Sequence, residues 1–180
     1  MTDQRYAALL RGINLGARNR IAMPDLQRIV AACGGTEVQT HLQSGNAVFR
    51  AAHDAVDLER DIAARIKDES GLDIPVLIRS ADELRAIHDD CPFTGKAVDP
   101  KRLHVTFCDA PPDPELIDGL SVPSSGKDRF AILGREVHLD CPDGYGRTKL
   151  QNAMWERKLG VVATTRNWNT VTALCELLDV

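Results

Sequence analysis

Short apolar runs alternate with amphipathic stretches along the first half of the chain, and this alternation predicts strands interleaved with helices. The predicted elements are a strand at 6–10, a helix from Met23-Pro24 to Gly34-Gly35, strands at 38–42 and 47–49 around a turn at Ser44-Gly45-Asn46, a helix through 58–66 that Gly71 ends, and a strand at 75–78. This βαββαβ order is that of the ferredoxin-like fold.

The second half of the chain repeats this order with different residues. It begins with a predicted helix opened by the capping box Ser80-Ala81-Asp82-Glu83, a strand at 103–108 and a helix from Asp113-Pro114. A turn at 124–126 and a hairpin of strands at 130–133 and 137–139 follow. The last predicted elements are a helix opened by a second capping box at Thr148-Lys149-Leu150-Gln151, a strand at 161–163 and a helix through 171–178. We therefore predict an α+β fold with mostly antiparallel sheet. It consists of two ferredoxin-like, βαββαβ-type units at 1–80 and 81–180, which as a packed pair can also be counted as one compact domain.

Composition places the chain among ordinary globular proteins, with 43% hydrophobic, 27% charged and 4% aromatic residues. No apolar run approaches the roughly 20 residues that cross a bilayer, and the N-terminus lacks the pattern of a signal peptide. We therefore expect a cytoplasmic protein that does not associate with membranes. The five cysteines include no C-x-x-C pair, so we expect buried, reduced thiols and neither a metal site nor a cofactor.

The net charge of −4 is distributed unevenly along the chain. Residues 1–50 carry six Arg or Lys and three Asp or Glu, and residues 127–180 carry eight and seven. Between them, residues 51–126 carry eight basic and sixteen acidic residues. The two flanking parts can therefore present a local positive field although the whole chain is acidic.

Polar motifs interrupt the apolar elements in the first half. Arg11-Gly12-Ile13-Asn14-Leu15-Gly16 follows the first strand, and Gln43-Ser44-Gly45-Asn46 forms the hairpin turn. Arg11 beside a buried strand needs a partner, which could be a bound anion or an internal carboxylate or carbonyl. Asn14, Gln43, Ser44 and Asn46 are further candidate ligand contacts, although turn structure alone would also explain them.

A glycine-containing segment, Gly144-Tyr145-Gly146, precedes the predicted helix start at Thr148. Free N–H groups at a helix N-terminus attract anions, and Arg147 and Lys149 add positive charge there. Cations normally avoid this end of a helix, so their presence favours an anion site. The alternative is two solvated cations on a surface turn. The segment matches neither a Walker A loop nor a dinucleotide-binding motif.

The last polar motif, Thr164-Thr165-Arg166-Asn167-Trp168-Asn169-Thr170, precedes the final helix. Arg166 is a candidate ligand contact, and either Asn167 or Asn169 could cap the helix or contact a ligand. We expect Trp168 to anchor the helix on the core. We expect Lys149 and Arg166 to lie in or just before the first turn of their helices, where neither would be retained for stability.

These motifs favour a binding module over an enzyme. The histidines lie far apart, and no zinc-protease, nucleophile-elbow or deaminase motif is present. We therefore predict a small module that binds a phosphorylated or carboxylated small molecule. One alternative is an enzyme whose site is assembled from Arg11, Gln43, Lys149 and Arg166. The other is RNA binding by the sheets, which the scarcity of stacking aromatics disfavours. The oligomeric state is left open.

The motifs at both ends of the chain also carry a family resemblance. Residues 8–16, Met23-Pro24 and residues 43–49, together with Lys149-Leu150, residues 156–160 and residues 164–171, resemble the bacterial family called domain of unknown function 1697. The resemblance spans nearly the whole chain and implies an α+β protein with ferredoxin-like units. It implies no activity and no catalytic residue.

Overall fold

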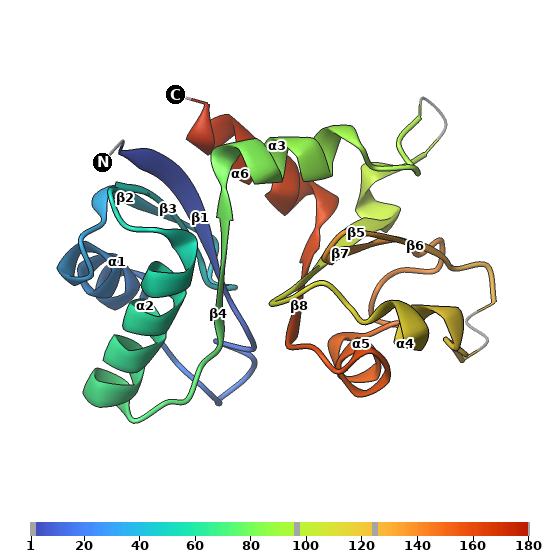
Figure 1. The fold of residues 1–180 in the computed structure, drawn as a ribbon, viewed down its shortest axis with the longest axis horizontal. Coiled ribbons are helices and arrows are strands. Elements are labelled where there is room, and N and C mark those ends of the chain that lie inside the picture. Colours follow the sequence, from blue (N-terminus) through green and yellow to red (C-terminus); the bar gives the residue numbers. More distant parts are fainter. Residues whose placement is uncertain (1–2, 96–97, 124–125, 180) are drawn as a thin grey trace. The chain divides into compact units, whose positions relative to one another are not determined.

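The computed structural model describes residues 3–95, 98–123 and 126–179, and the chain divides into two compact units (Figure 1). The first unit contains the chain up to residue 86 and the segment from 173 onward, and the second contains residues 87–172. The division falls within two helices, α3 (Ala81–Asp89) and α6 (Trp168–Leu178). The sequence had suggested a boundary at residue 80.

The first unit is a four-stranded antiparallel sheet with the strand order β2-β3-β1-β4. Its elements are β1 (Gln4–Leu10), α1 (Met23–Ala32), β2 (Thr36–His41), β3 (Asn46–Ala51), α2 (Ala55–Ser70) and β4 (Val76–Ser80), followed by the start of α3 and joined by the end of α6. Both the βαββαβ order and the sheet order are those of a ferredoxin-like unit.

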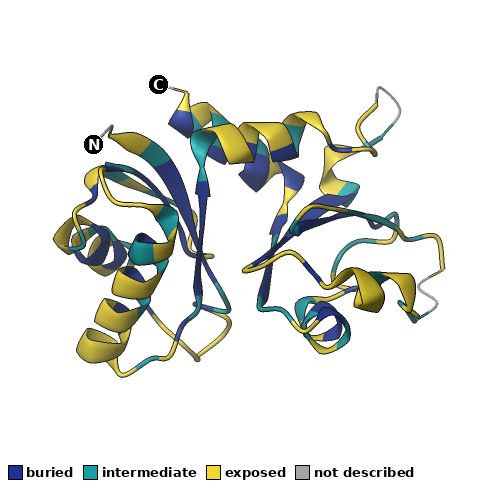
Figure 2. Ribbon diagram, viewed as in Figure 1, coloured by how far each residue is buried: buried dark blue, intermediate teal, exposed yellow. Residues whose placement is uncertain are grey.

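The central strand β1 is buried on both of its faces. Tyr6, Ala8 and Leu10 contribute to a core that α1 and α2 also line, while Ala7 and Leu9 on the opposite face are fully buried as well. Figure 2 shows β1 and β4 largely buried and the outer faces of α1 and α2 exposed. Burial on two faces explains why this strand is a continuous apolar run in the sequence.

The second unit has the same topology, with the strand order β6-β7-β5-β8 in a second antiparallel sheet. Its elements are the short 3₁₀ helix η1 (Pro100–Arg102), β5 (Leu103–Cys108), α4 (Pro114–Asp118), β6 (Arg129–Leu133), β7 (Glu136–Asp140), α5 (Asn152–Leu159) and β8 (Ala163–Asn167). Trp155 of α5 is fully buried in a core formed with residues of β5, β7 and β8. The predicted α+β fold of two ferredoxin-like units is confirmed.

One of the two predicted capping boxes is present. The backbone N–H of Glu83 donates to Ser80 Oγ, and Glu83 Oε2 accepts from the N–H of Ser80. The second prediction is wrong, because α5 begins at Asn152 with Gln151 as its N-cap. Thr148 Oγ instead donates to Asp128 and accepts from the N–H of Leu150, which forms a local turn before the helix.

The strand predicted at 161–163 is displaced toward the C-terminus. Strand β8 begins at Ala163 and continues through the polar residues Thr164 to Asn167, which pair with β5. Hydrogen bonding to an already buried strand outweighs the weak apolar character of this segment. In the turn predicted at 124–126, residues 124 and 125 lie outside the described residues.

Candidate functional site

The segment between β1 and α1, residues 11–22, extends beyond the end of the first sheet and is largely exposed (Figures 1 and 2). We call it the cationic loop because it carries three arginines and no aspartate or glutamate. Asparagine and glycine adopt left-handed backbone more easily than other residues, and four of them give this loop its path. They are Gly12 (φ 68°), Asn14 (φ 55°), Gly16 (φ 63°) and Asn19 (φ 49°).

The structure brings the predicted residues Asn14, Gln43, Ser44 and Asn46 together. The side-chain amide of Asn14 donates to the carbonyls of Ile21 and Gln43 at 3.0 and 2.8 Å, and its Oδ1 accepts from the N–H of Ile21 at 3.0 Å. The amide of Asn46 donates to the carbonyl of His41 and to Ser44 Oγ. The amide of Asn14 therefore holds the cationic loop against the β2–β3 turn, and the amide of Asn46 stabilises the turn itself.

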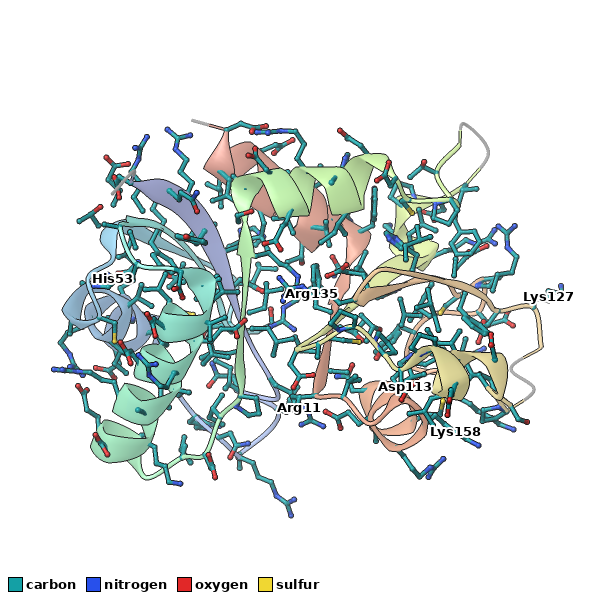
Figure 3. All side chains as sticks on the ribbon, viewed as in Figure 1. Arg11, His53, Asp113, Lys127, Arg135 and Lys158 are labelled. Atoms are coloured by element: carbon teal, nitrogen blue, oxygen red, sulfur yellow. The ribbon has the colours of Figure 1, made fainter. Side chains whose placement is uncertain are left out.

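The arginines of the cationic loop differ in their surroundings. Arg11 is half-buried at the end of β1 (Figure 3). Its backbone N–H donates to the carbonyl of Pro75. Arg18 and Arg20 are exposed, and neither pairs with a carboxylate among the described residues. The side chain of Arg20 makes one long contact, 3.4 Å to the carbonyl of Gly16. Arg18 and Arg20 were missed by motif analysis, although a run of arginines without an acidic residue would have indicated them.

Backbone donors are also available in this loop. Among the residues that the structure describes, the N–H groups of Gly16, Ala17, Asn19 and Arg20 have no internal acceptor. They belong to Arg20 and to residues within two positions of Arg18, the two arginines without a carboxylate partner in the described part of the chain. The cationic loop therefore combines charged and neutral donors in one exposed segment.

An exposed apolar pair adjoins these donors. Leu15 in the loop and Leu42 beside the β2–β3 turn expose 69% and 56% of their surface, and the Asn14–Gln43 hydrogen bond joins the residues next to them. Leu42 also has a left-handed backbone, with φ 60°. A leucine rarely adopts this conformation, so the turn carries local strain.

In the second unit, Arg147 and Lys149 are exposed and make no side-chain ion pair with the described residues. Because α5 begins at Asn152, neither residue lies in its first turn. The expectation that Lys149 marks the start of a helix is therefore corrected. The segment Gly144-Tyr145-Gly146 therefore does not lead directly into a helix, and the N–H groups of a helix N-terminus give no support for an anion site there.

Tyr145 of that segment points into its own unit. Its ring stacks on His104, with ring centroids 4.7 Å apart, and its hydroxyl bonds to Thr165. Burial raises the pKa of the Tyr145 hydroxyl. Thr165 Oγ also bonds to Thr106 at 2.7 Å and to Asn152 at 2.6 Å. The segment thus joins β5, β8 and the start of α5 through the hydroxyl groups of Tyr145, Thr106 and Thr165, which are buried or half-buried.

Arg166 is buried within β8, in contrast to Lys149. One guanidinium nitrogen donates to Thr164 Oγ at 2.7 Å and to the carbonyl of Thr165 at 3.0 Å. Removal from water lowers the pKa of Arg166 to about 10, so the side chain still carries its charge at neutral pH.

The two asparagines beside Arg166 have different roles. Asn167 Oδ1 accepts from the N–H of Thr170 at 2.8 Å and so caps α6, whereas Asn169 is exposed in the first turn. Trp168 is buried and stacks on His88, with ring centroids 4.7 Å apart. This packing agrees with the expected anchoring role of Trp168.

The described residues provide neither a metal-binding cluster nor a membrane-spanning helix. No three side chains of His, Cys, Asp or Glu are grouped closely enough there to hold a metal ion. None of the described helices combines the length and the apolar character that crossing a membrane requires.

Comparisons with known proteins support the fold and the family. The structure of the conserved bacterial protein SP0830 from Streptococcus pneumoniae is similar to this chain with a TM-score of 0.80 and 18% sequence identity, covering 99% of this chain and 100% of that one. At this identity the likeness establishes the fold alone. No curated protein matches the chain. A family model described as protein of unknown function (DUF1697) matches residues 3–138, and the chain therefore belongs to this family.

Proposed function

We propose that this protein is a cytoplasmic module that binds a phosphorylated or carboxylated small molecule through its cationic loop. One observation carries the proposal: exposed Arg18 and Arg20 have no carboxylate partner among the described residues, and free backbone N–H groups lie beside them. Guanidinium and backbone N–H groups together provide the donors that phosphate and carboxylate oxygens accept.

The neighbouring asparagines act as scaffold in this proposal. The hydrogen bonds of Asn14 join the loop to the β2–β3 turn, and those of Asn46 stabilise the turn, so the donors are positioned before a ligand arrives. Preorganisation of this kind reduces the entropy lost on binding. The predicted residues of the first unit thus support the site, while the anion contacts fall to Arg18 and Arg20.

The geometry disfavours the RNA-binding alternative. A sheet that recognises RNA needs an exposed face with stacking aromatics. Here the central strand β1 is buried on both faces, including Ala7 and Leu9, and the corresponding β5 is buried along its whole length. The other alternative, an enzyme, stays a prediction. Its site would be assembled from Arg11, Gln43, Lys149 and Arg166.

A screen for thermal stabilisation tests the proposal, using nucleotides, sugar phosphates, carboxylates and short RNAs. A ligand at about 100 times its Kd should stabilise the folded protein by about 2.7 kcal/mol. We expect NMR titration with such a ligand to shift the amide signals of residues 16–20. The Arg18→Gln/Arg20→Gln double variant should bind at least about tenfold more weakly, since each charge-assisted hydrogen bond contributes roughly 1.5–3 kcal/mol.

The matched control is Arg60→Gln, which changes an arginine on α2 that pairs with Asp57 and Asp61. It should bind like the unaltered protein. Equal binding by the double variant and by the unaltered protein would refute the cationic loop as the site. RNA as the sole ligand would favour the nucleic-acid alternative.

A further inference from the structure

A second candidate site lies at the opposite end of β1 from the cationic loop. A cleft of about 390 Å³ opens there within the first unit, where the start of β1, the end of β3, the start of α3 and the end of α6 meet. Three arginines and three aspartates line it: Arg5, Arg50 and Arg85, and Asp3, Asp82 and Asp179. Its volume falls within the range of small-molecule sites.

Two of these arginines face each other across paired strands. Arg5 on β1 is directly opposite Arg50 on β3 in the sheet register. Like charges in directly opposite positions destabilise a sheet. An anion held between them would convert this repulsion into attraction.

The two guanidinium groups differ in their partners, because Arg50 lies near two carboxylates and Arg5 near none in the described part of the chain. Arg5 donates to the carbonyl of Leu178 at 2.6 Å and pairs with no carboxylate among the described residues. Arg50 lies 3.6 Å from Asp3, and its buried Nε is 3.0 Å from Glu37 Oε2. That Nε nevertheless makes no hydrogen bond, because the distance to Glu37 is short but the direction of its N–H is unsuitable. This side of the cleft therefore keeps unused donor capacity.

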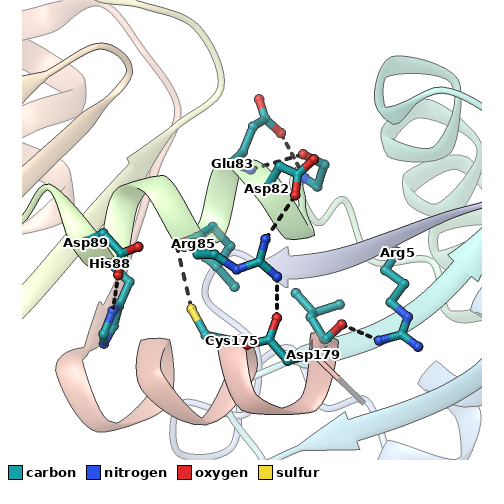
Figure 4. Close-up of polar contacts among 11 residues, drawn as sticks. Arg5, Asp82, Glu83, Arg85, His88, Asp89, Cys175 and Asp179 are labelled. Atoms are coloured by element: carbon teal, nitrogen blue, oxygen red, sulfur yellow. Dashed lines mark hydrogen bonds and ion pairs between the residues drawn. The ribbon is translucent and has the colours of Figure 1, made fainter.

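The other side of the cleft has the opposite character. Figure 4 shows the guanidinium of Arg85 between the carboxylates of Asp82 and Asp179. Two carboxylates around one guanidinium leave a net negative charge. The Sγ of Cys175 also contacts the carbonyl of Leu84, so the end of α6 is held against α3 and Asp179 is placed at the cleft. Of the residues that line the cleft, the strand side contributes two arginines and one aspartate and the helix side one arginine and two aspartates, so the net charge is positive at the strands and negative at the helices.

We infer that this cleft binds a small zwitterion of the amino-acid type. Its carboxylate would accept hydrogen bonds from Arg5 and Arg50, and its ammonium would donate to Asp82 and Asp179. A simple anion would satisfy the arginines but would lie near the two aspartates without compensation. The site is separate from the cationic loop and does not depend on the function proposed for it.

A smaller cavity suggests the kind of side chain. A cavity of about 90 Å³ lies beside the cleft and shares Arg5, Arg50 and Leu178 with it. Its other lining residues are Glu37, Gln39, Val48, Phe49 and Leu177. The apolar members of this set suit an apolar side chain. Free L-leucine is therefore the most informative probe.

The test compares three molecules that differ by one charged group. L-leucine carries both charges, isocaproate lacks the ammonium, and isoamylamine lacks the carboxylate. We expect L-leucine to shift the NMR amide signals of residues 4–5, 50 and 80–85 in a saturable titration, isocaproate to bind at least about tenfold more weakly, and isoamylamine to give no saturable shift. Equal binding of isocaproate would overturn the zwitterion assignment. The absence of any saturable shift with L-leucine would overturn the site.

Variants separate the two sides of the cleft. Arg5→Gln should weaken L-leucine binding at least tenfold. Arg5→Lys, which keeps the positive charge, should retain part of the affinity for L-leucine. The side chain of Asp82 is 94% exposed, so Asp82→Asn should leave the fold intact. It should weaken the binding of L-leucine and leave the weaker binding of isocaproate unchanged. Arg60→Gln, outside the cleft, is the matched control. Unaltered L-leucine affinity in both Arg5→Gln and Asp82→Asn would refute the inference.

Discussion

At the scale of single residues, similar cations in the second unit have opposite surroundings. Lys149 is exposed and makes no ion pair with the described residues, while Arg166 is buried and donates to Thr164 and Thr165. Each lies within a polar motif of the sequence, Lys149 at the end of residues 144–149 and Arg166 inside residues 164–170. Burial, and not residue type, decides which of them contributes to folding, because a buried polar group must keep its partners.

The two cations should therefore respond differently to substitution by glutamine. Arg166→Gln should lower the free energy of unfolding by about 2–4 kcal/mol, since it leaves buried acceptors without their donor. Lys149→Gln should change it by less than about 0.5 kcal/mol, as surface substitutions usually do. Urea denaturation of both variants measures the difference. An unchanged free energy of unfolding in Arg166→Gln would mean that the contacts of Arg166 add little to stability.

At the scale of elements, local capping signals define most helix ends, but the N-cap of α6 depends on wider structure. The sequence left Asn167 and Asn169 as alternative caps of α6, and the structure selects Asn167. Strand β8 continues to Asn167, so the helix begins immediately after the strand ends. The choice of cap therefore follows from where the pairing with β5 stops.

Alanine substitution at the two asparagines tests this assignment. Asn167→Ala should destabilise the protein by about 1 kcal/mol, because the N–H of Thr170 loses its acceptor. Asn169→Ala should have almost no effect or stabilise slightly, since alanine is the better helix former. Thermal unfolding of both variants gives the comparison. Equal losses at the two positions would contradict the single-cap assignment.

At the scale of the whole molecule, burial of a titratable group links stability to pH. His138 on β7 is almost completely buried, and its Nδ1 has no hydrogen-bond partner in the described part of the chain. Burial lowers the pKa of His138 from 6.5 to about 4, with a smaller opposing effect from Asp90. The folded protein therefore keeps this histidine neutral under mildly acidic conditions.

This shift predicts a loss of stability on acidification. Between the usual histidine pKa of about 6.5 and the folded value, the unfolded chain binds a proton that the folded protein does not, so stability falls as pH falls. A shift of this size corresponds to a loss of about 2 kcal/mol from about pH 7.5 to about pH 5. His138→Leu should remove most of that dependence, while the exposed His53→Gln should retain it. Urea denaturation at the two pH values provides the measurement, and an unchanged slope in His138→Leu would show that another group is responsible.

The sequence by itself determined the order of elements, the two βαββαβ series and most helix boundaries. These features depend on local periodicity, on glycine at turns and on capping residues such as Ser80 and Glu83, all of which act over a few neighbouring positions. It also located the two polar motifs that meet in the first unit. Asn14 and the turn at Gln43 to Asn46 were recognisable because these residue types mark turns.

Only the tertiary structure decided which of the polar groups are already used and which are available. The amides of Asn14 and Asn46 are satisfied internally, whereas Arg18 and Arg20 have no carboxylate partner among the described residues. Strand register likewise places Arg5 opposite Arg50 although they lie far apart in the sequence. Hydrogen-bond partners and charge neighbours across a sheet depend on long-range pairing, which local sequence patterns do not encode.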